Sequence, residues 1–207
     1  MMKLYYSPGT IASASALALE EARLPWEPVR VDFEAEEQRQ EPYLSLNPKG
    51  RVPVLVTTDG TFSETGAILE YIAARAPEAG LTPADPVALT RMRAAMYYFA
   101  STMHPNHAHK RRGHRWSDDP AAWVSMAAKV PDTMTDCAAY VEEHLLGDPF
   151  LLGDRLCVAD CYLYTISTWL AGDGVDLDAL PRLRAFQKAM AARPSVARVT
   201  ELGMIAR

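Results

Sequence analysis

The stretch from Asn47 to Leu69, NPKGRVPVLVTTDGTFSETGAIL, constrains the fold of this chain more than any other part of its sequence. Residues 52–63 hold two short runs of β-forming residues separated by Thr-Asp-Gly, a pattern typical of a β-hairpin. Apolar residues then recur at helical spacing, so we expect a helix that begins near Ser63 or Glu64 and continues to Ala76. A hairpin followed directly by a helix favours an α/β domain.

Two features of this stretch predict a binding site for a small anionic peptide. Pro53 stands at the start of a strand, where proline removes a ladder hydrogen bond. A cis Val52–Pro53 bond would leave the main chain of Val52 free to pair with an extended peptide. Glu64 and Thr65 lie at the expected helix N-terminus, whose free N–H groups and positive dipole end suit a carboxylate. The Glu64 carboxylate could hold the ammonium group beside it.

The sequence V-P-x-L, a hairpin and then S-E-T-G-A-I-L together resemble the glutathione-binding half of cytosolic glutathione transferases. The resemblance implies that glutathione is a co-substrate and that no other cofactor is required. The alternative is a hairpin–helix unit without a binding role. The residues that the resemblance assigns to glutathione binding are Ile11, Lys49, Arg51, Val52, Pro53, Glu64 and Thr65.

The segments before this stretch complete a domain with the order of a thioredoxin-like fold. Lys3–Ser7 and Val29–Phe33 are expected strands, and the alanine-rich segment Thr10–Leu24 is an expected helix between them. Two strands joined through a helix should pair in parallel. Pro28 favours an edge position for the second strand. We assign residues 1–78 to this domain, and the resemblance covers all of it.

The first turn differs at one position from the family that it resembles. It is close to the K-L-Y-Y-S-P-G-A-C-S opening of bacterial beta-type glutathione transferases, but Ile11 stands at their cysteine. A mixed disulfide between glutathione and this position is therefore not expected. The sulfur of glutathione itself would be the nucleophile, ionised at the N-terminus of the first helix. We favour the Thr10 hydroxyl as its stabiliser, then Ser7 and Ser13, with Tyr6 as a further candidate; Thr10 could equally be the helix N-cap.

The second half of the chain is expected to be helical throughout. Residues 79–87 form a linker, and residues 88–207 form an all-helical domain that carries the pocket for the second substrate. One long helix is expected over residues 89–115. Another is expected to begin at Asp119–Pro120 and to be kinked by Pro131.

The sequence C-V-A-D at Cys157–Asp160 resembles the capping box that begins the central buried helix of glutathione transferases. Asp160 at the third helical position can accept a hydrogen bond from the backbone N–H at the cap. Cys157 replaces the usual hydroxyl, and because sulfur is a weak acceptor we expect a weaker cap. The role of this motif is structural.

Four of the five histidines lie between Ser101 and Trp116. In the beta-type enzymes a histidine of this segment lines the glutathione sulfur and the second-substrate pocket, and we align His104 with it. Tyr6, His107 and Trp116 would complete that pocket, and the basic residues of the run would attract anions. A solvated basic helix end and a zinc site are alternatives. Because the run lacks carboxylates and cysteines, we predict no metal site.

Composition excludes several classes of protein. In 207 residues, of which 49% are hydrophobic, there is no run of about 18 apolar positions, so we expect a soluble globular protein. No apolar signal stretch precedes the first strand. Three cysteines, an odd number, suit reduced core thiols in the cytoplasm. The net charge of −5 gives no reason to expect binding to nucleic acid or membranes.

These features together predict a homodimeric glutathione transferase that joins the thiolate of glutathione to small apolar electrophiles. Two alternatives stay open. The first is a glutathione-dependent reductase of disulfides or peroxides. The second is a non-catalytic module of the same fold that binds ligands or proteins, for which Ile11 is the motivating feature; the Val52–Pro53 and Glu64–Thr65 pairs argue against it.

Overall fold

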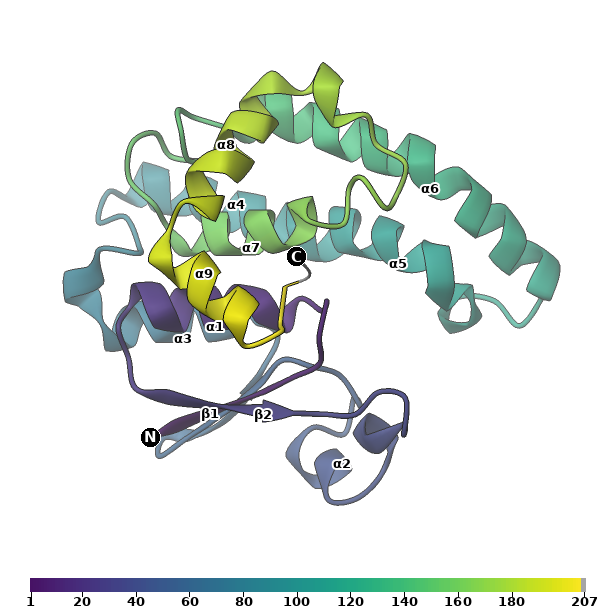
Figure 1. The fold of residues 1–207 in the computed structure, drawn as a ribbon, viewed down its shortest axis with the longest axis horizontal. Coiled ribbons are helices and arrows are strands. Elements are labelled where there is room, and N and C mark those ends of the chain that lie inside the picture. The colour runs from purple at the N-terminus through teal and green to yellow at the C-terminus, as the bar shows by residue number, and fades with distance from the viewer. Residues whose placement is uncertain (206–207) are drawn as a thin grey trace.

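The computed structural model describes residues 1–205, and its N-terminal part is built on a four-stranded sheet (Figure 1). The strand order is β2-β1-β3-β4, with β1 and β2 parallel and the other pairs antiparallel. The predicted parallel pair and the edge position of the second strand are therefore confirmed, although this strand spans Trp26–Arg30 and not the expected Val29–Phe33. The strands are β1 (Met2–Tyr6), β2 (Trp26–Arg30), β3 (Val54–Thr57) and β4 (Gly60–Ser63).

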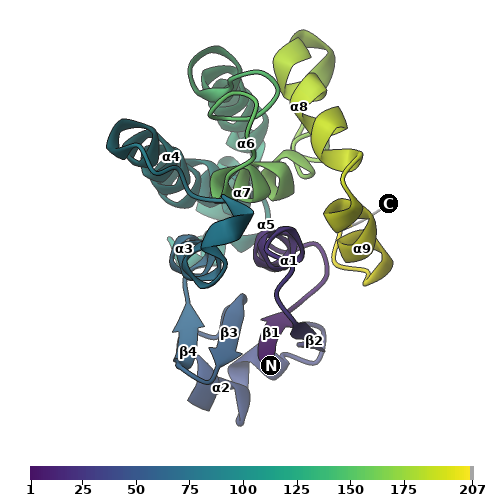
Figure 2. The same ribbon diagram turned by 90° about the vertical axis from the view of Figure 1, so that its left-hand side faces the viewer.

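Helices cover both faces of this sheet. Helices α1 (Ala12–Glu21) and α3 (Thr65–Arg75) lie on the face toward the helical half, and the short α2 (Tyr43–Leu46) lies on the other (Figure 2). The core divides in the same way. Leu4 belongs to the main cluster, which continues into the helical half, whereas Val54 packs in a small separate cluster. Adjacent residues of a strand point to opposite faces, which explains this division.

In the helical half, α-helices are linked by 3₁₀ and π-helical turns and pack around a central buried helix (Figure 1). That central helix is α7, in which every residue is buried. It contacts α1 and α3, so it joins the two halves of the molecule. The helices are α4 (Pro86–Tyr98), α5 (His104–Arg112), α6 (Pro120–Tyr140), α7 (Val158–Ser167), α8 (Pro181–Ala191) and α9 (Pro194–Glu201).

The helix expected over residues 89–115 is divided, which corrects the sequence-based expectation. A π-helical turn, Phe99–Met103, separates α4 from α5, and a 3₁₀ turn, Gly113–Arg115, ends α5. The division coincides with Pro105, which has no N–H and whose ring collides with the carbonyl four residues earlier in a regular helix. The wider π turn removes that requirement. By contrast, α6 continues through Pro131.

The expected helix starts are present. The Asp85 carboxylate accepts a hydrogen bond from the Ala88 N–H, and that of Asp119 accepts from the Ala121 N–H. At the start of α7 the Asp160 carboxylate accepts from the Cys157 N–H at 2.8 Å, as the capping box predicted. Within residues 1–205, no helix combines the length and the apolar character needed to cross a membrane.

Candidate functional site

The loop before β3 has the geometry that the sequence predicted. The Val52–Pro53 peptide bond is cis. The carbonyl oxygen of Arg51 accepts hydrogen bonds from the Tyr43 hydroxyl and the Asn47 amide, each at 2.7 Å, so the loop is held from two sides. Within residues 1–205 the main chain of Val52 forms no backbone hydrogen bond. One peptide unit is therefore available to an extended ligand.

Charged groups meet where this loop faces the start of α3. Lys49 donates hydrogen bonds to the Glu64 carboxylate at 2.5 Å and to the Ser63 hydroxyl at 2.8 Å. The side chain of Glu64 is 73% exposed, so a ligand can reach its carboxylate. The N–H groups of the first turn of α3, which begins at Thr65, point to the same place. An ammonium, a carboxylate and a helix N-terminus can together bind both charges of an α-amino acid.

Glu64 has an unusual backbone conformation. Its φ is 72° and its ψ is 118°, in a region that residues with a side chain rarely adopt. Such conformations persist where surrounding structure enforces them, and they concentrate at ligand-binding positions. The conformation turns the chain from β4 into α3 and sets the carboxylate beside Lys49. Sequence reasoning identified the residue but not this conformation.

The first turn does not use Thr10 in the way that capping preferences suggested. The residue that precedes α1 is Ile11, and no side chain caps the helix, so the N-cap prediction for Thr10 is wrong. The Thr10 hydroxyl instead donates to the Ser7 carbonyl at 2.6 Å, which closes the turn. Ile11 is almost fully buried. Its side chain has a packing role, as expected of an apolar group that cannot react with a thiol.

Two other candidate hydroxyls are bound to residues near the end of the chain. Ser13, which is buried, donates to the Met204 carbonyl at 3.1 Å. The same carbonyl accepts from the Gly9 N–H at 2.9 Å. The Tyr6 hydroxyl donates to the Leu202 carbonyl at 3.4 Å. These protons are engaged within the protein and fix the shape of the first turn.

Ser7 differs from the other candidates. Its side chain is buried at the end of β1, and its carbonyl receives both the Thr10 hydroxyl and the Thr10 N–H. Within residues 1–205 the Ser7 hydroxyl itself forms no hydrogen bond. Of the candidate hydroxyls of the first turn, that of Ser7 therefore has a proton to offer to a thiolate at the start of α1.

His104 lies at the start of α5, beside the first domain. Burial lowers its pKa to about 4, and the neighbouring His107, Arg112 and Arg115 act in the same direction. The imidazole is therefore neutral at pH 7 and can exchange hydrogen bonds without carrying charge. Its ring lies 5.3 Å from that of Trp169, which follows α7.

The residues predicted to line a pocket with His104 pack against two different rings. His107 stacks on Trp169 at 4.3 Å, and its Nδ1 lies 2.6 Å from the carboxylate of Asp173, which is buried. Trp116 packs against a different ring, that of His109, at 4.4 Å. Sequence reasoning missed Trp169 and Asp173. Their spacing of four residues directly after the apolar α7 was the available signal.

The remaining histidines pack against aromatic rings, such as that of His114 against Trp123. Among residues 1–205, no three His, Cys, Asp or Glu side chains converge in a way that could hold a metal ion. The three cysteines are free and buried. Burial raises the pKa of Cys157 and of Cys161, which makes them inert thiols in the core.

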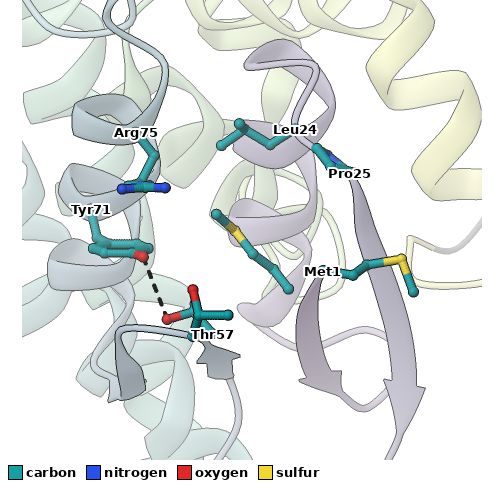
Figure 3. A pocket seen from close by; sticks show the side chains of 8 residues that line it. Met1, Leu24, Pro25, Thr57, Tyr71 and Arg75 are labelled. Carbon is teal, nitrogen blue, oxygen red and sulfur yellow. Dashed lines mark hydrogen bonds between the residues drawn. The ribbon is translucent and has the colours of Figure 1, made fainter.

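A partly open hollow lies away from all these residues. Figure 3 shows it between the ends of α1 and α3 that are opposite to the first turn and to Glu64. Its lining includes Leu24, Thr57, Tyr71 and Arg75, with the Tyr71 hydroxyl 3.4 Å from that of Thr57. None of the residues predicted for glutathione belongs to it.

Comparison with known proteins assigns both halves of the chain to one family. Residues 1–74 match the family described as glutathione S-transferase, N-terminal domain, and residues 116–201 match glutathione S-transferase, C-terminal domain. Glutathione S-transferase GstA of Escherichia coli O157:H7 is 30% identical over 94% of this chain and 95% of its own length.

Solved structures agree with these matches. A glutathione transferase homologue from Sulfitobacter with bound glutathione is 52% identical, with a TM-score of 0.97 over 99% of both chains. The beta-class glutathione S-transferase of Sphingomonas chungbukensis is 28% identical, with a TM-score of 0.83 over 97% of this chain and 98% of that one. The thioredoxin-like domain followed by an all-helical domain is thus the glutathione transferase fold that the sequence predicted. The chain belongs to the cytosolic glutathione S-transferase family and resembles its bacterial beta-type members, with isoleucine in place of their N-terminal cysteine.

Proposed function

We propose that this glutathione transferase joins the sulfur of glutathione to small electrophiles with an apolar body. The observation that carries the proposal is the meeting of the open main chain of Val52 with the Lys49–Glu64 pair at the N-terminus of α3. A scaffold protein has no use for an open main chain and two exposed charges at this place. Residues of both halves match the family, which supports the same proposal.

Each part of glutathione has a partner of suitable chemistry in this proposal. The main chain of Val52 pairs with the cysteinyl unit, and Glu64 with the N-terminus of α3 binds the α-amino acid end. Lys49 and Arg51 supply cations for the carboxylates. The cysteinyl sulfur then lies above Ile11, at the start of α1.

The thiol ionises in that position because the N-terminus of α1 favours an anion. The Ser7 hydroxyl donates a hydrogen bond to the thiolate, and Thr10 holds the turn that presents it. The thiolate attacks an electrophilic carbon, the new bond is carbon to sulfur, and the leaving group departs with its electron pair. Tyr6 and His104, with Trp169 behind His104, line the place of the electrophile.

His107 and Trp116 flank the place of the electrophile. From the family we also propose that the protein is a homodimer and lies in the cytoplasm. The reductase alternative gains no support from the cysteines. All three are buried in the helical half, where none can form a mixed disulfide with glutathione at the first turn without local unfolding.

A spectroscopic titration tests the proposal. Thiolate absorbance of bound glutathione is followed against pH, and turnover is measured with 1-chloro-2,4-dinitrobenzene. We expect a thiol pKa well below about 8.5, the value of a free thiol. Ser7→Ala should raise it, whereas Ser13→Ala, whose hydroxyl is already bound to Met204, should not. Binding without ionisation and without turnover contradicts a transferase. Turnover of a disulfide substrate alone favours the reductase.

A further inference from the structure

Three arginine side chains from both halves of the molecule gather beside His104. Arg51 precedes the cis-proline loop of the N-terminal domain, Arg112 ends α5, and Arg115 ends the 3₁₀ turn that follows. We call these three residues the arginine cluster. Their charges act on one another and on His104, so the cluster spans the boundary between the two domains.

The arginine cluster has no acidic counterpart. Arg93 forms a two-pronged ion pair with Glu70, but within residues 1–205 no carboxylate lies within ion-pair distance of a cluster member. Acidic residues are not scarce, since the chain has 26 of them against 21 Lys and Arg. Arg112 is half-buried, and burial lowers its pKa, with the charge of Arg51 as a further cause. This unneutralised charge is a site for an anion.

An apolar surface lies next to this charge. The ring of Trp169 faces His104 at 5.3 Å and His107 at 4.3 Å, and the buried Asp173 fixes His107. Flat rings of this kind accept an aromatic or unsaturated carbon skeleton. Guanidinium groups offer paired donors that match the two oxygens of a carboxylate. A molecule that carries both parts fits the two surfaces together.

We propose that Arg112 and Arg115 of the arginine cluster bind a carboxylate of the second substrate, so that the preferred electrophiles are organic anions with an unsaturated or aromatic reactive part. The proposal rests on the transferase function proposed above. Glutathione does not account for Arg112 and Arg115, because Lys49, Arg51, Glu64 and the N-terminus of α3 provide for its charged ends. Arg112 and Arg115 belong to the helical half, which lies across from that set.

Two matched electrophiles isolate the contribution of the carboxylate. The probes are 4-chloro-3-nitrobenzoate and 4-chloro-3-nitrobenzamide, which both lose chloride when the glutathione thiolate attacks the ring carbon but differ in charge. The readout is the ratio of kcat/KM for the acid to that for the amide. Taking the ratio cancels effects on glutathione binding and thiolate formation, which are common to both reactions.

Arg112→Gln should lower this ratio by about 10-fold, the loss of one charge-assisted hydrogen-bonded pair, and Arg112→Gln with Arg115→Gln should lower it further. Arg112→Lys, which keeps the charge without the fork, should fall between the wild type and Arg112→Gln. Lys188→Gln on the exposed surface of α8 removes the same unit of charge elsewhere and should leave the ratio unchanged. Added salt should lower turnover of the acid more than that of the amide.

The outcomes separate this inference from the function on which it rests. If the amide is conjugated and the ratio stays constant in both glutamine variants, the arginine cluster does not bind the electrophile and the inference is wrong. The inference is also wrong if the variants raise the glutathione dissociation constant while the ratio stays constant, because the arginines then bind glutathione. If neither probe reacts and bound glutathione stays a thiol, the transferase function itself fails. Should Arg112→Gln not fold, Arg115→Gln alone and Arg112→Lys supply the comparison.

Discussion

The backbone of Glu64 leads to a prediction in which stability and binding change in opposite directions. At φ 72° and ψ 118°, a residue with a Cβ bears a strain of about 1–3 kcal/mol. Glu64→Gly relieves that strain but gives the unfolded chain more freedom, at a cost of about 0.5–1 kcal/mol. Glu64→Ala keeps the strain. Both variants lose the exposed ion pair with Lys49, so its contribution cancels between them.

We therefore expect Glu64→Gly to be more stable than Glu64→Ala by about 1 kcal/mol, the middle of the range that these terms leave. For a chain of this size that difference raises Tm by about 2–4 °C. Both variants should bind glutathione about 10-fold to 100-fold more weakly than the wild type, because each lacks the charge-assisted hydrogen bond to the ammonium group of the ligand.

Differential scanning calorimetry without glutathione measures Tm, and isothermal titration calorimetry measures the dissociation constant. The reasoning about strain is refuted if Glu64→Gly melts at or below the temperature of Glu64→Ala. The reasoning about the ligand is refuted if either variant binds glutathione as the wild type does. The two parts are independent, so one can fail without the other.

Three further predictions follow from the same geometry. Ser13→Ala should lower the free energy of unfolding by about 1 kcal/mol in chemical denaturation, because the Met204 carbonyl loses one of its two donors. Since the Gly9 N–H still binds that carbonyl and holds the turn, kcat should stay unchanged, and a large loss of kcat would contradict the structural role. Cys157→Ser should raise stability by about 0.5–1 kcal/mol through a better acceptor for the Asp160 N–H, and an unchanged or lower Tm would contradict the cap. His104→Asn should reduce the loss of stability between pH 6.5 and pH 4: burial lowers the His104 pKa to about 4, so in this window the unfolded chain takes up a proton that the folded chain does not. Equal pH profiles for this variant and the wild type would show that His104 is not buried as described.

The sequence was sufficient where short-range rules decide the structure. The hairpin and helix that frame Glu64, the parallel strand pair and the helix starts at Asp85 and Asp119 follow from neighbouring residues, and all are present. The cis bond before Pro53 followed from the cost of proline in a strand.

It was insufficient where distant parts of the chain compete for the same group. Thr10 has a residue type suited to an N-cap, yet its hydroxyl closes a turn onto Ser7. The Ser13 hydroxyl is not available to a ligand because it donates to a carbonyl 191 residues away, which no local pattern indicates. The pairing of Asp173 with His107 depends in the same way on how α5 packs against the segment after α7.

The hydrogen bonds between Met204 and the first turn have a consequence for the synthesis of the enzyme. Met204, which completes the shape of the turn through Gly9 and Ser13, is synthesised long after the turn itself. The N-terminal domain leaves the ribosome first and can fold as a unit. Its turn nevertheless lacks two hydrogen bonds until Met204 emerges. A nascent chain can thus acquire its fold early, whereas the turn that presents Ser7 to glutathione takes its final form only after the helical half up to Met204 has been synthesised.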